Sequence, residues 1–97
     1  MISGISEAKL KDWEQAQKPF QLIDVREADE RVAHNIGGDW IPLGEIIRRR
    51  EEISREIPVV FYCRKGIRSQ IAIQRLLGTG QFNSDLLFNL TGGIGEG

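Results

Sequence analysis

The uninterrupted apolar segment VVFYC, residues 59–63, constrains the fold of this chain more than any other feature of its sequence. Its residues favour a β-strand, and it lacks the polar alternation of a strand with one face in water. A strand of this kind is covered on both faces, as in a parallel sheet between helices. Further buried strands are predicted at FQLIDV (20–25) and DLLFNL (85–90), and a brief extended segment at DWIPL (39–43).

The segments between these strands have helical composition. We predict helices over residues 5–17 with Ser6 as the N-cap, a short polar helix over 26–35, and longer ones over 44–57 and 69–80. The helix over 44–57 would carry its isoleucines on one side and ion pairs such as Arg48–Glu52 and Glu51–Arg55 on the other. Alternating strands and helices predict one three-layer α/β domain over residues 1–97, with a central, mostly parallel sheet and right-handed crossovers.

Composition and charge exclude several classes of function. A net charge of -1 over 97 residues gives no electrostatic basis for binding nucleic acid or an anionic membrane. The single cysteine cannot form an internal disulfide, and with one histidine it cannot supply a structural zinc site. No signal-like segment opens the chain, and no apolar run approaches the ~18 residues of a membrane span. We therefore expect a soluble protein of the reducing cytoplasm, without nucleic-acid or membrane partners.

The sole cysteine, Cys63, ends the best strand and is followed by the basic turn RKGIR. Gly66 permits a positive φ, so the turn can form a cup of inward-pointing amides at the N-terminus of the next helix. In such surroundings a cysteine has a pKa of about 3.5–7.5, against ~8.5 when free. Arg64 and Lys65 would attract an anionic substrate. Because Cys63 lies at the strand end and not inside VVFY, we favour a reactive thiol over a packed one.

Several neighbours of this loop are candidates for supporting roles. Asp24 and Arg26 end the preceding strand at the same sheet edge, where the carboxylate would accept loop N–H groups or form an ordinary strand-end turn. Arg68 would either fold back onto Asp24 or face the substrate, and Ser69 would either cap the helix or contact the sulfur. His34 is not assigned as a general base, because an ionised thiolate needs none.

Four segments, in order along the chain, resemble rhodanese-like sulfurtransferase domains. YCRKGIRS (62–69) resembles their active-site loop, and LIDVRE (22–27) resembles a strand that ends in Asp-Val-Arg. AHNIGGDWIPLGEI (33–46) is similar to the family's His-Ile-Pro-Gly-Ala segment, with Asn35 added and Gly37 in place of proline. LFNLTGGI (87–94) resembles the closing strand and its Gly-Gly turn, after which the family usually adds a helix that the tail GGIGEG does not match.

The resemblance implies a chemistry as well as a fold. Cys63 would accept a sulfane sulfur from a donor anion such as thiosulfate, become a persulfide, and pass the sulfur to a thiol or protein acceptor. The covalent intermediate implies ping-pong kinetics, and no metal or organic cofactor is needed. The implied binding loop consists of Arg64, Lys65, Gly66, Ile67, Arg68 and Ser69, and the implied supporting residues are Asp24 and Arg26.

The length of the cysteine loop distinguishes among other possible functions of Cys63. Cysteine phosphatases and arsenate reductases use C-x5-R loops, whereas four residues separate Cys63 from Arg68 here. The smaller cup suits one sulfur atom better than a tetrahedral phosphate. A dithiol oxidoreductase is excluded because there is no second cysteine. An interaction or regulatory module without turnover, and a persulfide carrier for a dedicated partner, remain alternatives.

Overall fold

The computed structural model describes residues 2–95 and contains a sheet of five strands in the order β1-β5-β4-β2-β3. Every strand pairing in it is parallel. The strands are β1 (Ser3–Ile5), β2 (Gln21–Asp24), β3 (Asp39–Trp40), β4 (Val59–Tyr62) and β5 (Leu87–Leu90). The helices are α1 (Glu7–Gln15), α2 (Ala28–Ala33) and α3 (Arg68–Gly78), with 3₁₀ turns η1 (Leu43–Glu45), η2 (Arg50–Glu52) and η3 (Ser84–Leu86). The predicted α/β class, with a parallel sheet between helices, is confirmed.

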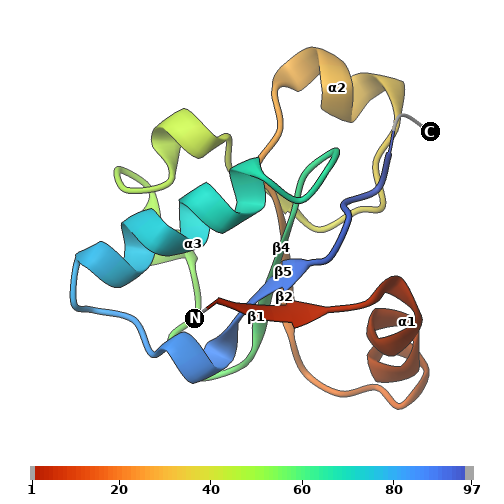
Figure 1. The fold of residues 1–97 in the computed structure, drawn as a ribbon, viewed down its shortest axis with the longest axis horizontal. Coiled ribbons are helices and arrows are strands. Elements are labelled where there is room, and N and C mark those ends of the chain that lie inside the picture. Colours follow the sequence, from red (N-terminus) through yellow and green to blue (C-terminus); the bar gives the residue numbers. More distant parts are fainter. Residues whose placement is uncertain (1, 96–97) are drawn as a thin grey trace.

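The sheet separates two helical layers, with α3 on one face and α1 on the other, while α2 lies beyond one end of the strands (Figure 1). The central strand β4 is buried along its whole length. Val59 and Phe61 pack in the same apolar cluster as Ile73 of α3, whereas Val60 and Tyr62 pack in a second cluster with residues of α1. The prediction that VVFY is covered on both faces is confirmed.

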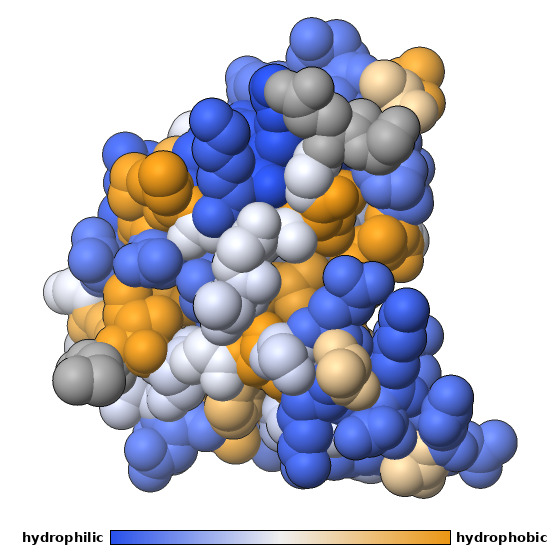
Figure 2. Space-filling view, turned by 45° about the vertical axis from the view of Figure 1, so that its right-hand side comes forward, coloured by the Kyte–Doolittle hydropathy of each residue, from blue (hydrophilic) through white to orange (hydrophobic). Residues whose placement is uncertain are grey.

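Helix α1 begins where its N-cap predicts, because the Lys9 N–H donates to Ser6 Oγ at 3.1 Å. Its buried residues are Leu10 and Trp13, and the Trp13 ring meets Phe88 of β5 edge-on with a centroid distance of 5.4 Å. The outer side of α1 is hydrophilic (Figure 2, lower right). The sequence did not predict β1, which pairs with β5 at the sheet edge. Only one of its three residues, Ile5, is buried, so the segment carries no periodic signal.

The single helix predicted over residues 44–57 is wrong. The segment forms η1 and η2 joined by turns, because side-chain contacts from the sheet replace helical hydrogen bonds. Gln21 of β2 donates to the Glu52 carbonyl at 2.8 Å and accepts from the Ser54 N–H at 2.8 Å. The predicted ion pair Glu51–Arg55 forms, whereas Arg49, and not Arg48, pairs with Glu52.

The remaining elements agree with the predictions to within a few residues. The helix predicted over 69–80 extends from Arg68 to Gly78, and the strand predicted over 85–90 begins two residues later because residues 84–86 form η3. Within residues 2–95, none of the helices combines the length and the apolar character that crossing a bilayer requires.

Candidate active site

Cys63 directly follows β4, where the chain turns toward α3, and its residue is 1% exposed. Its sulfur accepts backbone hydrogen bonds from the Gly66 N–H at 3.1 Å and from the Ser69 N–H at 3.4 Å. Gly66 has a φ of 86°, which turns its N–H inward and which a residue with a Cβ rarely adopts. The loop therefore points its donors at the sulfur, the arrangement that the spacing of Cys63 and Gly66 predicts.

These donors change the acidity of the thiol. Burial by itself would raise the pKa of Cys63, but hydrogen bonds from the Ser69 side chain and from the backbone of Ser69, Lys65 and Gly66 outweigh it, so the pKa is lowered. Each donor stabilises the thiolate more than the neutral thiol. The site therefore favours the nucleophilic thiolate more than water does.

Ser69 contacts the sulfur and is not the N-cap of α3, a position held by Ile67. Its hydroxyl oxygen lies 3.4 Å from Cys63 Sγ and also hydrogen-bonds Asn89 Oδ1. Asn89 is on β5, and only 6% of the residue is exposed. Reasoning from sequence missed Asn89, although a polar residue inside the apolar segment DLLFNL is the signal that could have found it.

The segment after β5 supports the back of the loop. The Ile94 N–H donates to the Cys63 carbonyl at 3.0 Å, and the Gly95 N–H donates to the Arg64 carbonyl at 2.9 Å. Gly93 lies so close that an added Cβ would overlap the carbonyls of Cys63 and Arg64. Because the loop carbonyls bond outward to this segment, the loop amides are left to point toward the sulfur.

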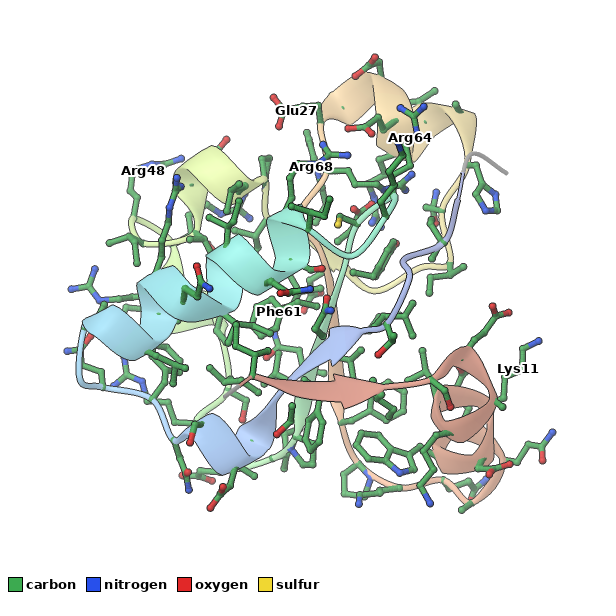
Figure 3. All side chains as sticks on the ribbon, viewed as in Figure 1. Lys11, Glu27, Arg48, Phe61, Arg64 and Arg68 are labelled. Carbon is green, nitrogen blue, oxygen red and sulfur yellow. The ribbon has the colours of Figure 1, made fainter. Side chains whose placement is uncertain are left out.

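A hollow of about 310 Å³ opens above the sulfur. It is lined by Cys63, Arg64, Lys65, Ile67 and Arg68. Arg64 and Arg68, both labelled in Figure 3, lie between the start of α3 and α2. Lys65 is exposed, and Ile67 is 62% exposed. The mouth of the site therefore combines positive charge with one apolar side chain, a surface suited to an anion.

Asp24 and Arg26 are buried at the same sheet edge and hold each other. Arg26 donates to Asp24 through its backbone N–H at 3.0 Å and through its guanidinium at 2.9 and 3.0 Å. A guanidinium of Arg31 adds a contact of 3.3 Å. The hydrogen bonds described for Asp24 thus come from arginines, and not from the loop amides that were one expectation from sequence. The same Arg26 guanidinium reaches the His34 carbonyl at 2.5 Å, which ties β2 to the end of α2.

Arg68 does not fold back onto Asp24, one of the two orientations expected from sequence; it lines the hollow above the sulfur and is held there by α2. Its guanidinium binds the Glu30 carboxylate through two hydrogen bonds of 2.7 Å each. These bonds from Arg68, helped by one from the Glu27 N–H and opposed by burial, lower the pKa of Glu30 to about 2. Sequence reasoning missed Glu30, since its position in the polar segment READERVAHN gives no sign of a partner in the cysteine loop.

Within residues 2–95, histidine, cysteine and carboxylate side chains do not gather in groups of three or more that could hold a metal ion.

The model of the family described as "Rhodanese-like domain" matches residues 6–96. Three relatives come from Bacillus subtilis (strain 168). "Uncharacterized protein YqhL" is 36% identical over 87% of this chain. "Putative sulfurtransferase YtwF" is 40% identical over 70% of the chain, and "Putative sulfur carrier protein YrkF" is 32% identical over 80% of it. The chain spans 65%, 67% and 44% of the lengths of these three relatives, in that order.

Solved structures show the same fold. A rhodanese-like domain protein from Staphylococcus aureus superposes with a TM-score of 0.81 at 24% identity, covering 95% of this chain and 87% of that one. At this identity the likeness concerns the fold. The parallel sheet, the helical layers and the position of the cysteine loop at the strand ends are those that the four sequence segments predicted.

Proposed function

This chain belongs to the rhodanese-like domain family, and from that premise we propose that it is a sulfurtransferase whose Cys63 carries sulfur as a persulfide. The family handles sulfur transfer, and two relatives bear names that refer to a sulfurtransferase and a sulfur carrier. The donor that we propose is a small anion with a sulfane sulfur, such as thiosulfate. The acceptor is a thiol, either a small molecule or a cysteine on another protein.

The observation that carries the proposal is the convergence of hydrogen-bond donors on one sulfur. The Gly66 and Ser69 amides donate to Cys63 Sγ at 3.1 and 3.4 Å, and the Ser69 hydroxyl oxygen lies 3.4 Å from it. A thiolate held in this way is a nucleophile at neutral pH. The donors close around the sulfur itself, and four residues separate Cys63 from Arg68, one fewer than in the C-x5-R loops of phosphatases, which supports sulfur transfer over phosphoryl transfer.

The reaction balances in two steps. The Cys63 thiolate attacks the outer sulfur of thiosulfate, the S–S bond of the donor breaks, and sulfite leaves with its electron pair while Cys63 becomes a persulfide anion. An acceptor thiolate then attacks the outer sulfur of this persulfide. The S–S bond of the Cys63 persulfide breaks, and the Cys63 thiolate is regenerated. Neither step needs an external oxidant or reductant, and the enzyme alternates between two covalent states.

In this proposal the loop residues have separate tasks. Arg64 and Lys65 at the mouth raise the local concentration of an anionic donor. The amides of the loop from residue 64 to Ser69 stabilise the negative charge of the thiolate and of the persulfide. Arg68, held by Glu30, fixes the first turn of α3 relative to α2. Asp24 and Arg26 are supporting residues that keep the neighbouring strand end rigid.

A second candidate, a persulfide carrier dedicated to a protein partner, is favoured by one observation. Ile67 lies at the mouth of the site, and 62% of it is exposed. An apolar side chain contributes little to binding a small anion, whereas it would pack against a protein surface. In a carrier of this kind, loading of Cys63 would be efficient and transfer to small thiols would be slow.

Intact-mass measurement tests the proposal directly. The reduced protein is incubated with thiosulfate, its mass is recorded, and cyanide is then added. We expect a gain of one sulfur that cyanide removes as thiocyanate, and no gain in the Cys63→Ser variant. Single-turnover transfer from the loaded protein to dithiothreitol then separates a general sulfurtransferase, which discharges quickly, from a dedicated carrier, which keeps its sulfur.

Two other results would count against the proposal. If no sulfur is gained although Cys63 is alkylated readily at neutral pH, thiosulfate is not the donor, and glutathione persulfide is the next one to use. If Cys63 gains no sulfur from either donor and also resists alkylation, the cysteine is a packed residue. In that case the interaction or regulatory module without turnover becomes the better interpretation.

A further inference from the structure

We infer that Asn89 is a positioning residue that directs the hydroxyl proton of Ser69 and reverses that direction when Cys63 ionises. The inference rests on the proposed function only in assigning the ionised form to catalysis. It concerns a residue on β5 that lies outside the cysteine loop and was not expected from sequence.

Three buried polar groups form a hydrogen-bond chain that begins at the sulfur. Cys63 Sγ and Ser69 Oγ are 3.4 Å apart, and Ser69 Oγ hydrogen-bonds Asn89 Oδ1. The exposed fractions of these residues are 1%, 0% and 6%. Polar groups that are this well buried must satisfy one another, because leaving one without a partner costs free energy.

The Ser69 hydroxyl has only one proton to donate. When Cys63 is a neutral thiol, the S–H can donate to Ser69 Oγ, and the hydroxyl in turn donates to Asn89 Oδ1. Once the sulfur is an anion, it needs a donor, and the only proton on Ser69 Oγ is the one already given to Asn89. A fixed acceptor at position 89 would therefore hold that proton away from the thiolate.

An asparagine removes this conflict because its amide offers both an acceptor and a donor. A rotation of about 180° about the bond between Cβ and Cγ exchanges Oδ1 for the NH₂ group. Asn89 would then donate to Ser69 Oγ, and the hydroxyl would donate to the sulfur anion. Both ends of the chain are satisfied in both states, and hydrogen bonds that run in one direction strengthen one another.

The charged groups around the sulfur do not provide such a switch near neutral pH. Arg64, Lys65 and Arg68 face the hollow from the loop and from α3, and the carboxylate that binds Arg68 is Glu30 of α2, whose pKa is about 2. On the neighbouring strand Asp24 is held by Arg26. The cationic side chains among these groups favour the thiolate, whereas the carboxylates oppose it. The chain from Cys63 to Asn89, in contrast, has hydrogens that can reorient.

A double-mutant cycle tests this assignment. The pKa of Cys63 is measured from the pH dependence of its alkylation by iodoacetamide in the wild type, Asn89→Asp, Ser69→Ala and the double variant. Asn89→Asp introduces a carboxylate. When it is ionised, this group can accept hydrogen bonds but cannot donate one, and it also adds a negative charge near the sulfur. The charge raises the pKa of Cys63 in either background. The loss of the Ser69 hydroxyl as a donor to the sulfur matters only in the background that contains Ser69. We therefore expect Asn89→Asp to raise the pKa of Cys63 by about one to two pH units more in that background than in Ser69→Ala.

Equal shifts in the two backgrounds would overturn the inference, because they would show a purely electrostatic effect. A second measurement uses the wild-type protein, in case the Asn89→Asp substitution prevents folding. The side-chain amide protons of Asn89 are followed by NMR through the titration of Cys63. We expect their resonances to move with the midpoint of the thiol in the wild type and to stay unchanged in Ser69→Ala.

If the Asn89 amide resonances of the wild type do not shift during the titration of Cys63, that result would also refute the role of Asn89. Both readouts report on the thiol and not on sulfur transfer. If the cycle shows coupling between Ser69 and Asn89 but the protein forms no persulfide, the result would contradict the proposed function alone. A persulfide that forms while the cycle shows no coupling would contradict this inference alone.

Discussion

Glu30 and Arg68 form a two-point ion pair that fastens α2 to the first residue of α3, with both N–O distances at 2.7 Å. The pair lies beside the hollow over Cys63, and it joins residues 38 positions apart in the chain. Its effect is mechanical as well as electrostatic. The guanidinium is held in a fixed direction, and the start of α3, which supplies the Ser69 amide to the sulfur, is tied to a second helix.

Replacing Glu30 by glutamine should destabilise the fold in a pH-dependent way. The pKa of Glu30 falls from 4.5 to about 2, chiefly through Arg68. A depressed carboxyl pKa contributes stability that is fully present above the ordinary pKa and is lost as the pH falls toward the folded-state value. We expect Glu30→Gln to lose about 1–2 kcal/mol at pH 7, after allowing for solvent screening of a partly exposed pair. Urea unfolding at pH 7 and near pH 3 measures this loss.

Near pH 3 the difference between the two proteins should shrink, because the Glu30 carboxyl, with an ordinary pKa of 4.5, is protonated in the unfolded wild-type chain at that pH and folding must release the proton. Glutamine keeps an oxygen that can accept the Glu27 N–H, so the cap of α2 is preserved. Glu7→Gln, which removes the exposed pair with Lys11, serves as the control and should cost less than about 0.5 kcal/mol. A loss for Glu30→Gln that is the same at both pH values would show that charge is not the cause.

Replacing Gly66 by alanine should raise the pKa of Cys63. Gly66 has a φ of 86°, and an added Cβ would lie 3.1 Å from the Gly92 nitrogen. The peptide must shift, and with it the N–H that bonds the sulfur at 3.1 Å. Loss of one such bond raises the thiol pKa by about one unit. The pH dependence of alkylation measures the shift, and the rate of persulfide formation at pH 7 should fall with the thiolate fraction.

Gly80→Ala is the matched control for this substitution. Gly80 follows α3 with a φ of 74°, and an added Cβ would meet nothing within 4 Å. Both variants therefore carry the strain of a positive φ, about 1–2 kcal/mol, while only Gly66 touches the sulfur site. Equal shifts of the thiol pKa in the two proteins would show that backbone strain, and not the displaced Gly66 N–H, is the cause.

Much of this site could be predicted from the sequence because its signals are local. The segment VVFYC identifies a central buried strand, and the glycine three residues after Cys63 indicates an inward turn of amides. The resemblance of four segments supplies the fold and the chemistry. Each of these inferences uses residues that are neighbours in the chain or that share one motif.

The parts that could not be predicted depend on contacts between distant residues. Glu30 meets Arg68 across 38 positions, and Ser69 meets Asn89 across 20. A single sequence with polar residues at these positions does not say which of them will face each other. The error over residues 44–57 has the same origin, since Gln21 of β2 bonds the backbone that the helix would have used. Tertiary hydrogen bonds here override a helical composition.

Replacing Gly93 by alanine should disturb the loop from behind. An added Cβ would lie 2.5 Å from the Cys63 carbonyl oxygen, and it would overlap the Arg64 carbonyl as well. These are backbone atoms of the loop and cannot move without displacing its amides. We expect a loss of more than about 2 kcal/mol in the free energy of unfolding, together with slower alkylation of Cys63 at pH 7.

Gly92→Ala separates backbone strain from the overlap with the loop carbonyls. Gly92 has a φ of 79°, similar to the 67° of Gly93, but an added Cβ there meets no atom within 4 Å. It should cost about 1–2 kcal/mol through backbone strain and leave the reactivity of Cys63 unchanged. If Gly92→Ala slows alkylation as much as Gly93→Ala does, the close approach to the loop carbonyls is not the reason.

Replacing Lys65 by glutamine should reduce the preference of the site for anions. Lys65 lines the mouth of the hollow and is exposed, so its substitution should leave the fold intact. Its charge favours the approach of an anionic reagent to Cys63, but it acts little on a neutral one. Iodoacetate and iodoacetamide alkylate the same sulfur and differ in charge. We expect Lys65→Gln to slow iodoacetate by roughly two- to fivefold more than iodoacetamide at low salt.

The difference between the two reagents should fade in 1 M salt, where the Debye length is about 3 Å. Lys9→Gln on α1, also exposed but outside the hollow, should change neither rate. An equal slowing of both reagents by Lys65→Gln would mean that the substitution changes the thiol and not the attraction of anions. If the attraction is the cause, the same variant should raise the KM for thiosulfate and leave transfer from the loaded persulfide to a neutral thiol unchanged, because only the first step brings a dianion to the mouth.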